Sequence, residues 1–203
     1  VLGFEAAPAL EQGLAGKDGA WLVTWQDRVI DPVGFVPYFL DRAGAETKNV
    51  PPFWQLGLQH WTLQAGARYP SSADPQHADA ANFDHKLGLL GWDDPIDGEL
   101  TVYWQALNSL PEDYQVSLVL EDASGAELGR WDGRPAGYDY PTTRWSVDRA
   151  VFGRYPLPGS AGASGERYVT LAIYAPDAPE GLNIRDVADN PAGKRVRLGP
   201  LRF

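Results

Sequence analysis

The chain has 203 residues, room for one large domain or one domain with a smaller subdomain, and its hydrophobic share of 44% excludes a wholly disordered chain. Its formal net charge of −10 and scattered basic residues argue against nucleic acid as a partner. The absence of cysteine excludes disulfides, thiolate nucleophiles and cysteine-ligated zinc, and no apolar run is long enough to span a bilayer.

The first part of the chain, residues 1–64, mixes helical and strand patterns and predicts a small α/β segment. The expected order is helix 7–16, strand 20–27, helix 31–44 and strand 53–63. AWLVTWQD at 20–27 is a continuous apolar run, typical of a buried parallel strand. In the second helix, Gly34 is expected at the N-cap and Gly44 just after the last turn. Pro37 then falls in the first turn, where a missing amide is tolerated.

Residues 65–82 are rich in Ala, Ser, Asp and Pro without any period, and they predict a linker. From 83 to 203 the pattern alternates with period two, as in Leu100, Val102 and Trp104. Eight strands are expected, at 85–92, 99–107, 114–122, 126–132, 149–157, 166–175, 182–187 and 194–203. Turn residues separate them, including the stretch from Gly159 to Gly165. Short strands at this spacing predict a two-sheet antiparallel β-sandwich, immunoglobulin-like or jelly-roll in type.

Aromatic residues gather between 98 and 148 and raise the question of a sugar-binding site. Trp104 shares the alternating face of its strand and is predicted to lie in the core. The long connection after the strand at 126–132 is the candidate carbohydrate-binding segment. Its candidate residues, with one from the preceding strand, are Trp131, Tyr138, Tyr140, Arg144 and Trp145. Such a loop can stack on sugar rings or cover one end of the sandwich, and the covering role is favoured while both stay open.

The sequence gives little support for a metal site, a catalytic triad or a phosphate-binding site. The three histidines, His60, His77 and His85, lack metal-ligand or triad spacing, and no phosphate-binding glycine motif is present, so no metal or other cofactor is expected. Asp186, Asp189 and Asn190 form a short acidic loop that lacks EF-hand spacing, and a polar turn is favoured over a calcium site.

Adjacent carboxylates and a group of basic residues are two further candidate features. The pairs Asp93-Asp94 and Glu112-Asp113 leave a glycosidase open only if folding brings two carboxyl groups together. The basic residues near the C-terminus alternate and predict the solvent side of a strand rather than a phosphate site: Lys194, Arg195, Arg197 and Arg202.

LTVYWQAL at 100–107 and YPTTRW at 140–145 carry a family resemblance. With YQVSLVLEDASGAELGRWDG before the second motif and ERYVTLAIYAPDAPEGL after it, the chain resembles the extracytoplasmic C-terminal β-sandwich of bacterial multi-spanning glycosyltransferase-like proteins. The family is the protein-mannosyltransferase / aminoarabinose-transferase superfamily, and AWLVTWQDRVIDPVGFVPYFLDRAG resembles the α/β segment before its sandwich. The resemblance implies a parent enzyme that moves a sugar from a polyprenyl-phosphate donor. The catalytic loops of that family have no match here, so the resemblance assigns no catalytic residue.

The sequence leaves three alternative functions open. The first is a non-catalytic extracytoplasmic accessory domain, tethered to the cell membrane through a parent transmembrane region and contacting a glycan or acceptor. The start at Val1 without Met leads us to expect a piece of a longer protein. The second is a free-standing carbohydrate-binding β-sandwich module, and the third is a β-sandwich glycoside hydrolase.

Overall fold

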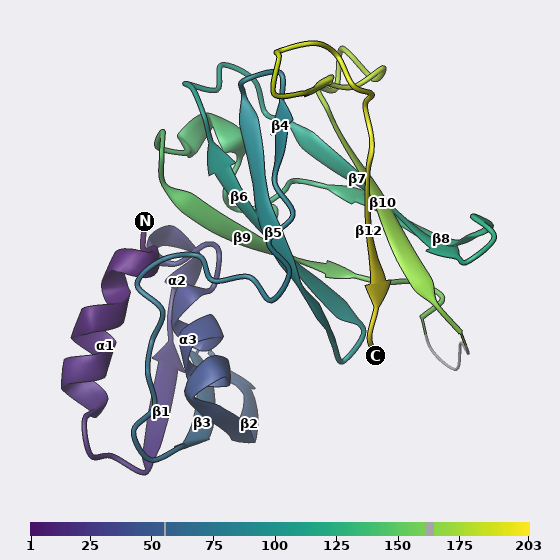
Figure 1. Ribbon diagram of the computed structural model, residues 1–203. Helices are drawn as coiled ribbons and strands as arrows, with labels where there is room; N and C mark the ends of the chain where they lie inside the picture. Colours follow the sequence, from purple (N-terminus) through teal and green to yellow (C-terminus); the bar gives the residue numbers. More distant parts are fainter. Residues whose placement is uncertain (55, 161–164) are drawn as a thin grey trace. The chain divides into compact units, whose positions relative to one another are not determined.

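The computed structural model describes residues 1–54, 56–160 and 165–203, without the side chains of residues 52 and 53. Residue 55 of the strand expected at 53–63 and residues 161–164 of the connection expected from Gly159 to Gly165 therefore lie outside the described residues. The chain divides into two compact units, Val1–Asp74 and Pro75–Phe203. The expected linker, 65–82, is shared between them, so each unit is described separately (Figure 1).

The first unit is a three-stranded antiparallel sheet with helices. Its elements are η1 (Phe4–Ala6), α1 (Ala7–Leu14), β1 (Gly19–Thr24), α2 (Asp27–Ile30), α3 (Phe35–Ala43), β2 (Gly44–Phe53) and β3 (Leu56–Leu63). The strand order is β1-β3-β2. Buried aromatic side chains of α3 pack around Phe4, whose ring centroid lies 5.0 Å from that of Phe35. The indole of Trp61 on β3 donates to Asp41 of α3 at 2.8 Å, which joins helix and sheet.

Two features of this unit differ from what the sequence predicts. The apolar run of β1 was expected to be a buried parallel strand, yet β1 is an antiparallel strand at the edge of the sheet. Trp21 and Val23 remain exposed, so the run is apolar without being buried on both faces. β2 was not expected, because its sequence GAETKNVPPF combines charges with two prolines.

The helix expected at 31–44 forms as α3, but the contacts at its two ends differ from those expected. Gly34 is the N-cap, while the carboxylate of Asp31 accepts the amide hydrogens of Phe35 at 2.7 Å and Val36 at 2.9 Å. These bonds satisfy amides that a helix start leaves unpaired. Gly44 is extended, with φ −173°, rather than left-handed. Its lack of a side chain matters because a Cβ there would collide with the carbonyl group of Thr62.

The second unit is a β-sandwich, and each of the eight expected strands overlaps an observed strand. Its elements are β4 (Ala81–Phe83), β5 (Leu87–Ile96), β6 (Glu99–Ala106), β7 (Gln115–Asp122), β8 (Glu127–Gly133), η2 (Thr142–Arg144), β9 (Ala150–Pro156), β10 (Arg167–Tyr174), β11 (Ile184–Arg185) and β12 (Val196–Leu201). The strand expected at 182–187 is only two residues long, and β4 was not expected because its first residues fall in the expected linker. One sheet has the order β11-β4-β5-β6-β9 and the other β12-β10-β7-β8. Both sheets are antiparallel, so the expected β-sandwich is confirmed (Figure 1).

Alternation along the strands places the core between the sheets. Val169, Leu171 and Ile173 of β10 are buried, while the residues between them reach the outer face. On β6, Trp104 is fully buried, as the pattern predicts. The last strand contains a register shift against β10 near Gly199-Pro200, where a bulge or edge was expected.

A buried hydroxyl group joins this core to the loop after β8. The indole of Trp104 donates to the hydroxyl oxygen of Tyr155 on β9 at 2.7 Å, and that hydroxyl donates to the carbonyl of Pro135. Burial raises the pKa of Tyr155 far above its ordinary value, so the phenol stays protonated. Gly153 permits this arrangement, because a Cβ there would collide with both the Pro135 carbonyl and the Tyr155 ring.

Replacing this hydroxyl tests its contribution. Tyr155→Phe keeps the ring but leaves the Trp104 indole and the Pro135 carbonyl without their buried partner. We expect the free energy of unfolding to fall by about 1–3 kcal/mol, because each buried polar group loses its hydrogen bond without regaining water. Urea unfolding measures the loss. Tyr168→Phe is the matched control, since it removes only an exposed bond to Glu166, and an equal loss in both variants would contradict the account.

Candidate functional site

The predicted sugar-binding loop is largely built into the sandwich. Tyr140 and Trp145 are 2% and 6% exposed, and their rings stack at a centroid distance of 6.2 Å. The Trp145 indole donates to the carbonyl of Tyr140 at 3.2 Å. Thr142, which is fully buried, donates to the carbonyl of Glu112 and accepts the amide of Tyr114. These two rings therefore cover the end of the core and offer little surface to a sugar.

The other candidates of that loop lie nearer to solvent. Tyr138 is exposed, and the guanidinium of Arg134 lies 4.9 Å from its ring centroid. Arg144 is exposed beside the ring of Tyr140. Trp131 is half-buried and packs edge to face with Tyr155, with centroids 4.9 Å apart. The structure thus leaves Tyr138 and Arg144 as the accessible members, and binding by this loop stays a prediction.

A different surface, the outer face of the sheet β12-β10-β7-β8, carries a hollow of about 280 Å³. It follows from the same alternation that builds the core, because residues between the buried ones point outward. The lining residues are Ser117, Val119, Arg130, Asp132, Thr170, Ala172, Tyr174, Pro179, Glu180, Gly181, Lys194 and Arg195. The face therefore combines neutral polar, aromatic and oppositely charged groups.

The hollow has a simple geometric cause. Ser117 pairs with Asp132 on one side and with Ala172 on the other, so two small residues occupy neighbouring positions at the centre of the sheet. Longer side chains stand around them, including Arg130 and Tyr174. Small residues between long ones leave a depression without any loop insertion. Sequence reasoning missed it, because the cross-strand register decides which small residues meet.

The charges around the hollow suit a polar ligand. Burial first and the nearby carboxylate of Asp132 second raise the pKa of Tyr174, so its hydroxyl is protonated at neutral pH and can donate. Lys194 and Arg195 have no ion-pair partner among the residues that the structure describes. Donors and acceptors therefore face the same space, which is the pattern that hydroxyl groups of a ligand require.

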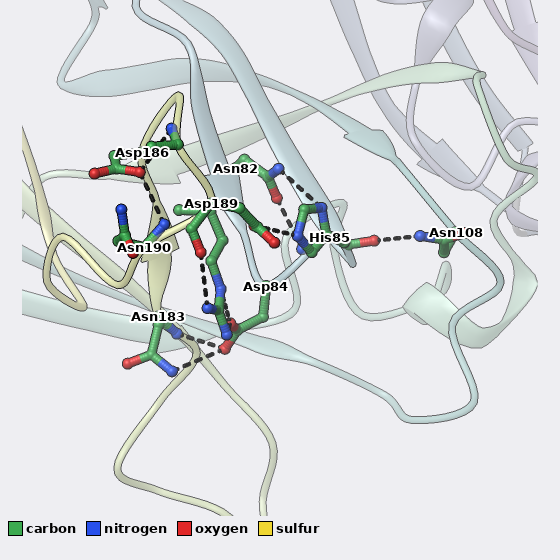
Figure 2. A network of polar contacts seen from close by, with 10 residues as sticks. Asn82, Asp84, His85, Asn108, Asn183, Asp186, Asp189 and Asn190 are labelled. Carbon is green, nitrogen blue, oxygen red and sulfur yellow. Dashed lines mark hydrogen bonds and ion pairs between the residues drawn. The ribbon is translucent and has the colours of Figure 1, made fainter.

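A second polar cluster joins the turn between β4 and β5 to the segment around β11 (Figure 2). The carboxylate of Asp84 accepts the Arg185 Nε hydrogen at 2.6 Å and the backbone amide of Asn183 at 2.7 Å. His85 Nε2 lies 2.6 Å from Asp189 Oδ1, and the other ring nitrogen, Nδ1, lies 3.3 Å from the amide nitrogen of Asn82. Both ring nitrogens of His85 thus have neighbours, and the cluster connects segments a hundred residues apart.

The acidic loop in this cluster is a polar turn. One carboxylate oxygen of Asp186 accepts the backbone amides of Ala188 and Asn190 at 2.9 and 2.8 Å. Within residues 1–54, 56–160 and 165–203, no three His, Cys, Asp or Glu side chains form a group able to hold a metal ion. The hydrogen bonds of Asp84 hold the turn between β4 and β5 against the segment around β11, which is a structural role.

The clamp around Asp84 predicts an acid-sensitive contribution to stability. Burial alone would raise the pKa of Asp84, but the Asn183 amide and the Arg185 guanidinium outweigh it and hold the pKa below its ordinary value. Its contribution is present above the unfolded-state pKa of about 4 and is lost as pH falls through the folded pKa. Asp84→Asn should lower the free energy of unfolding by about 1–2 kcal/mol at pH 7.

The pH dependence identifies the source of that loss. The difference in unfolding free energy between wild type and Asp84→Asn should shrink as pH falls below about 4. Chemical denaturation at a series of pH values measures it. Asp97→Asn, at an exposed turn residue whose side chain has no hydrogen bond or ion pair among the described residues, is the control, and a difference independent of pH would refute the ionic explanation.

Comparisons with known proteins return a distant structural similarity. No family model matches the chain, and no curated protein matches it. Among solved structures it is similar to the crystal structure of an endonuclease/exonuclease/phosphatase from Beutenbergia cavernae DSM 12333, at 13% identity and a TM-score of 0.30. That match covers 77% of this chain and 35% of the other, so the chain spans about a third of its length. A similarity of this size supports no argument about fold or function.

These findings correct the family resemblance. No family model and no curated protein connects the chain with the protein-mannosyltransferase / aminoarabinose-transferase superfamily. The two sharpest motifs have a packing explanation. LTVYWQAL alternates because it is the core strand β6, and YPTTRW covers the core through Tyr140, Thr142 and Trp145. Unrelated sandwiches can meet both requirements.

The accessory role beside a membrane enzyme and the extracytoplasmic location rested on that resemblance, and they stay predictions without structural support. In the part of the chain that the structure describes, no helix is both long and apolar enough to cross a membrane.

Proposed function

We propose that the second unit is a non-catalytic carbohydrate-binding module, with its ligand in the hollow on the outer face of β8, β7 and β10. The observation that carries the proposal is the position of Ser117 and Ala172 between longer polar and aromatic side chains. The depression lies just below the 300–1,000 Å³ range of drug-sized ligand sites, a size that suits about one sugar ring and its substituents.

The mixed chemistry of the hollow favours a sugar over a charged ligand. Lys194 and Arg195 can donate, Asp132 can accept, and the Tyr174 hydroxyl can donate because it is protonated. Arg130 is already paired with Glu127 and donates to Ser117. A nucleic acid or a phosphate would favour a surface of one sign, whereas Asp132 and Glu180 place carboxylates among the basic groups. The Tyr174 ring supplies an apolar surface for the C–H face of a sugar.

The hydrolase alternative is retained for one reason, the presence of two carboxylates, Asp132 and Glu180, around one hollow. A glycosidase requires such a pair on opposite sides of the scissile bond. Release of reducing sugar from a bound oligosaccharide, lost in Asp132→Asn and Glu180→Gln, would support this alternative in place of simple binding.

Calorimetric titration with oligomers of glucose, mannose, galactose and xylose tests binding. Ala172→Leu should abolish binding, because its side chain fills the hollow while pointing away from the core. Asp132→Ala should weaken it about 10-fold, as expected for one hydrogen bond of about 1.4 kcal/mol. Both should keep the wild-type melting temperature within a few degrees.

Controls separate this surface from the loop. Tyr168→Phe changes an outward residue of the same strand that does not line the hollow, and Tyr138→Ala removes the exposed ring of the loop. Binding lost in Tyr138→Ala but kept in Ala172→Leu would move the site to the loop. The absence of binding across the panel would contradict the proposal.

A further inference from the structure

The two edges of the sheet in the first unit are unlike each other. β2 carries Glu46, Lys48 and two prolines, and its register against β3 shifts twice. Charges, prolines and bulges are the usual means by which proteins prevent an edge strand from pairing with another chain. β1 at the opposite edge has the sequence GAWLVT, without charge or proline, and pairs with β3 in unbroken register from Gly19 to Thr24.

The hydrogen-bonding groups at the free edge of β1 follow from this register. The amide of Leu63 donates to the carbonyl of Asp18 at 2.9 Å, so Asp18 and Leu63 are a hydrogen-bonded pair of the antiparallel ladder. Bonded positions alternate in an antiparallel pair. Gly19, Trp21 and Val23 therefore direct their N–H and C=O groups away from β3. Among the described residues, no backbone hydrogen bond reaches these groups from another segment.

Apolar side chains accompany this edge. Trp21 is 54% exposed and Val23 is 61% exposed, although both belong to a regular strand. They point to the same face of the sheet as His60 and Leu58 of β3. The Trp21 ring lies 4.6 Å from the His60 ring and 5.7 Å from the ammonium group of Lys48, so these neighbours hold it in place. Contiguous exposed apolar patches mark interaction surfaces, and Trp21 and Val23 are neighbours on one face of the strand.

We propose that β1 pairs antiparallel with β1 of a second copy of this chain, forming a continuous six-stranded sheet across a two-fold axis. A symmetric contact brings the strand against a copy of itself, so a net charge on the strand would be repelled by the same net charge on the second copy. In a chain of net charge −10, β1 is a strand of six residues without charge, which makes it suited to self-pairing. The contact would cover Trp21 and Val23 of both copies.

The geometry also fixes the register. If Trp21 lies opposite Trp21 of the second copy, Val23 faces Gly19, and all paired residues from 19 to 23 lie within the strand. Centring the contact on Leu22 would instead pair Gly19 with Trp25, which lies beyond the end of β1. Directly opposite residues that exchange hydrogen bonds have Cα atoms about 5.5 Å apart, within reach of a disulfide.

Single-cysteine cross-linking of the full chain tests both pairing and register, since the natural sequence has no cysteine. Trp21→Cys should form a disulfide-linked dimer under mild oxidation, whereas Val23→Cys should stay largely uncross-linked because it faces Gly19. Cross-linking at equal rates in the two variants would reveal random collision and overturn the proposal. So would the absence of cross-linked dimer in Trp21→Cys.

Light scattering on the unmodified chain supplies an independent measurement. The molar mass should rise from 22.2 kDa toward twice that value as concentration increases through the micromolar range. Val23→Pro removes an outward N–H that β3 does not use, and Trp21→Lys places two like charges opposite each other. Both variants should stay at monomer mass with an unchanged circular dichroism spectrum, while Val23→Thr should dimerise. A wild type that remains monomeric throughout would refute the proposal.

Discussion

The hydroxyl group of Tyr155 is the contact on which the closed end of the sandwich depends. It accepts from Trp104 in the neighbouring strand and donates to Pro135 in the loop after β8, a strand of the other sheet. The ring of the same residue packs against Trp131 of β8. One side chain thus holds both sheets and the loop, and the loop aromatics Tyr140 and Trp145 are buried against this end of the core. The burial of two predicted sugar-binding rings follows from this packing.

The fixed core determines the outer surface as well. Once Leu118 and Leu171 point inward, the residues beside them must point outward. Ser117 and Ala172 are neighbours on that outer face for this reason, and the hollow follows from their small size. The candidate site is therefore a property of strand register, and a shift of one residue in β7 or β10 would remove it.

The sandwich could be predicted from the sequence because its strands alternate and its turns carry Gly, Asp and Pro. The first unit was predicted less well. AWLVT is apolar at consecutive positions, a pattern that indicates burial on both faces, yet β1 buries neither Trp21 nor Val23. GAETKNVPPF contains the residues that protect an edge strand, and the same residues conceal it from propensity arguments. The hollow depends on pairings between segments fifty residues apart, which no local pattern records.

The misleading signal in β1 and its proposed role share one cause. A strand that is apolar on both faces is normally stabilised by layers on both sides, but the described residues cover only the face toward α3 with helices. Leaving Trp21 and Val23 in water forgoes favourable free energy at about 25 cal/mol per Å² of apolar surface. The opposite edge, β2, carries charges and prolines that prevent pairing with another chain, although these residues lower its strand propensity. The absence of such residues at β1 is what a pairing edge requires, and the exposed side chains beside it are those that pairing would cover.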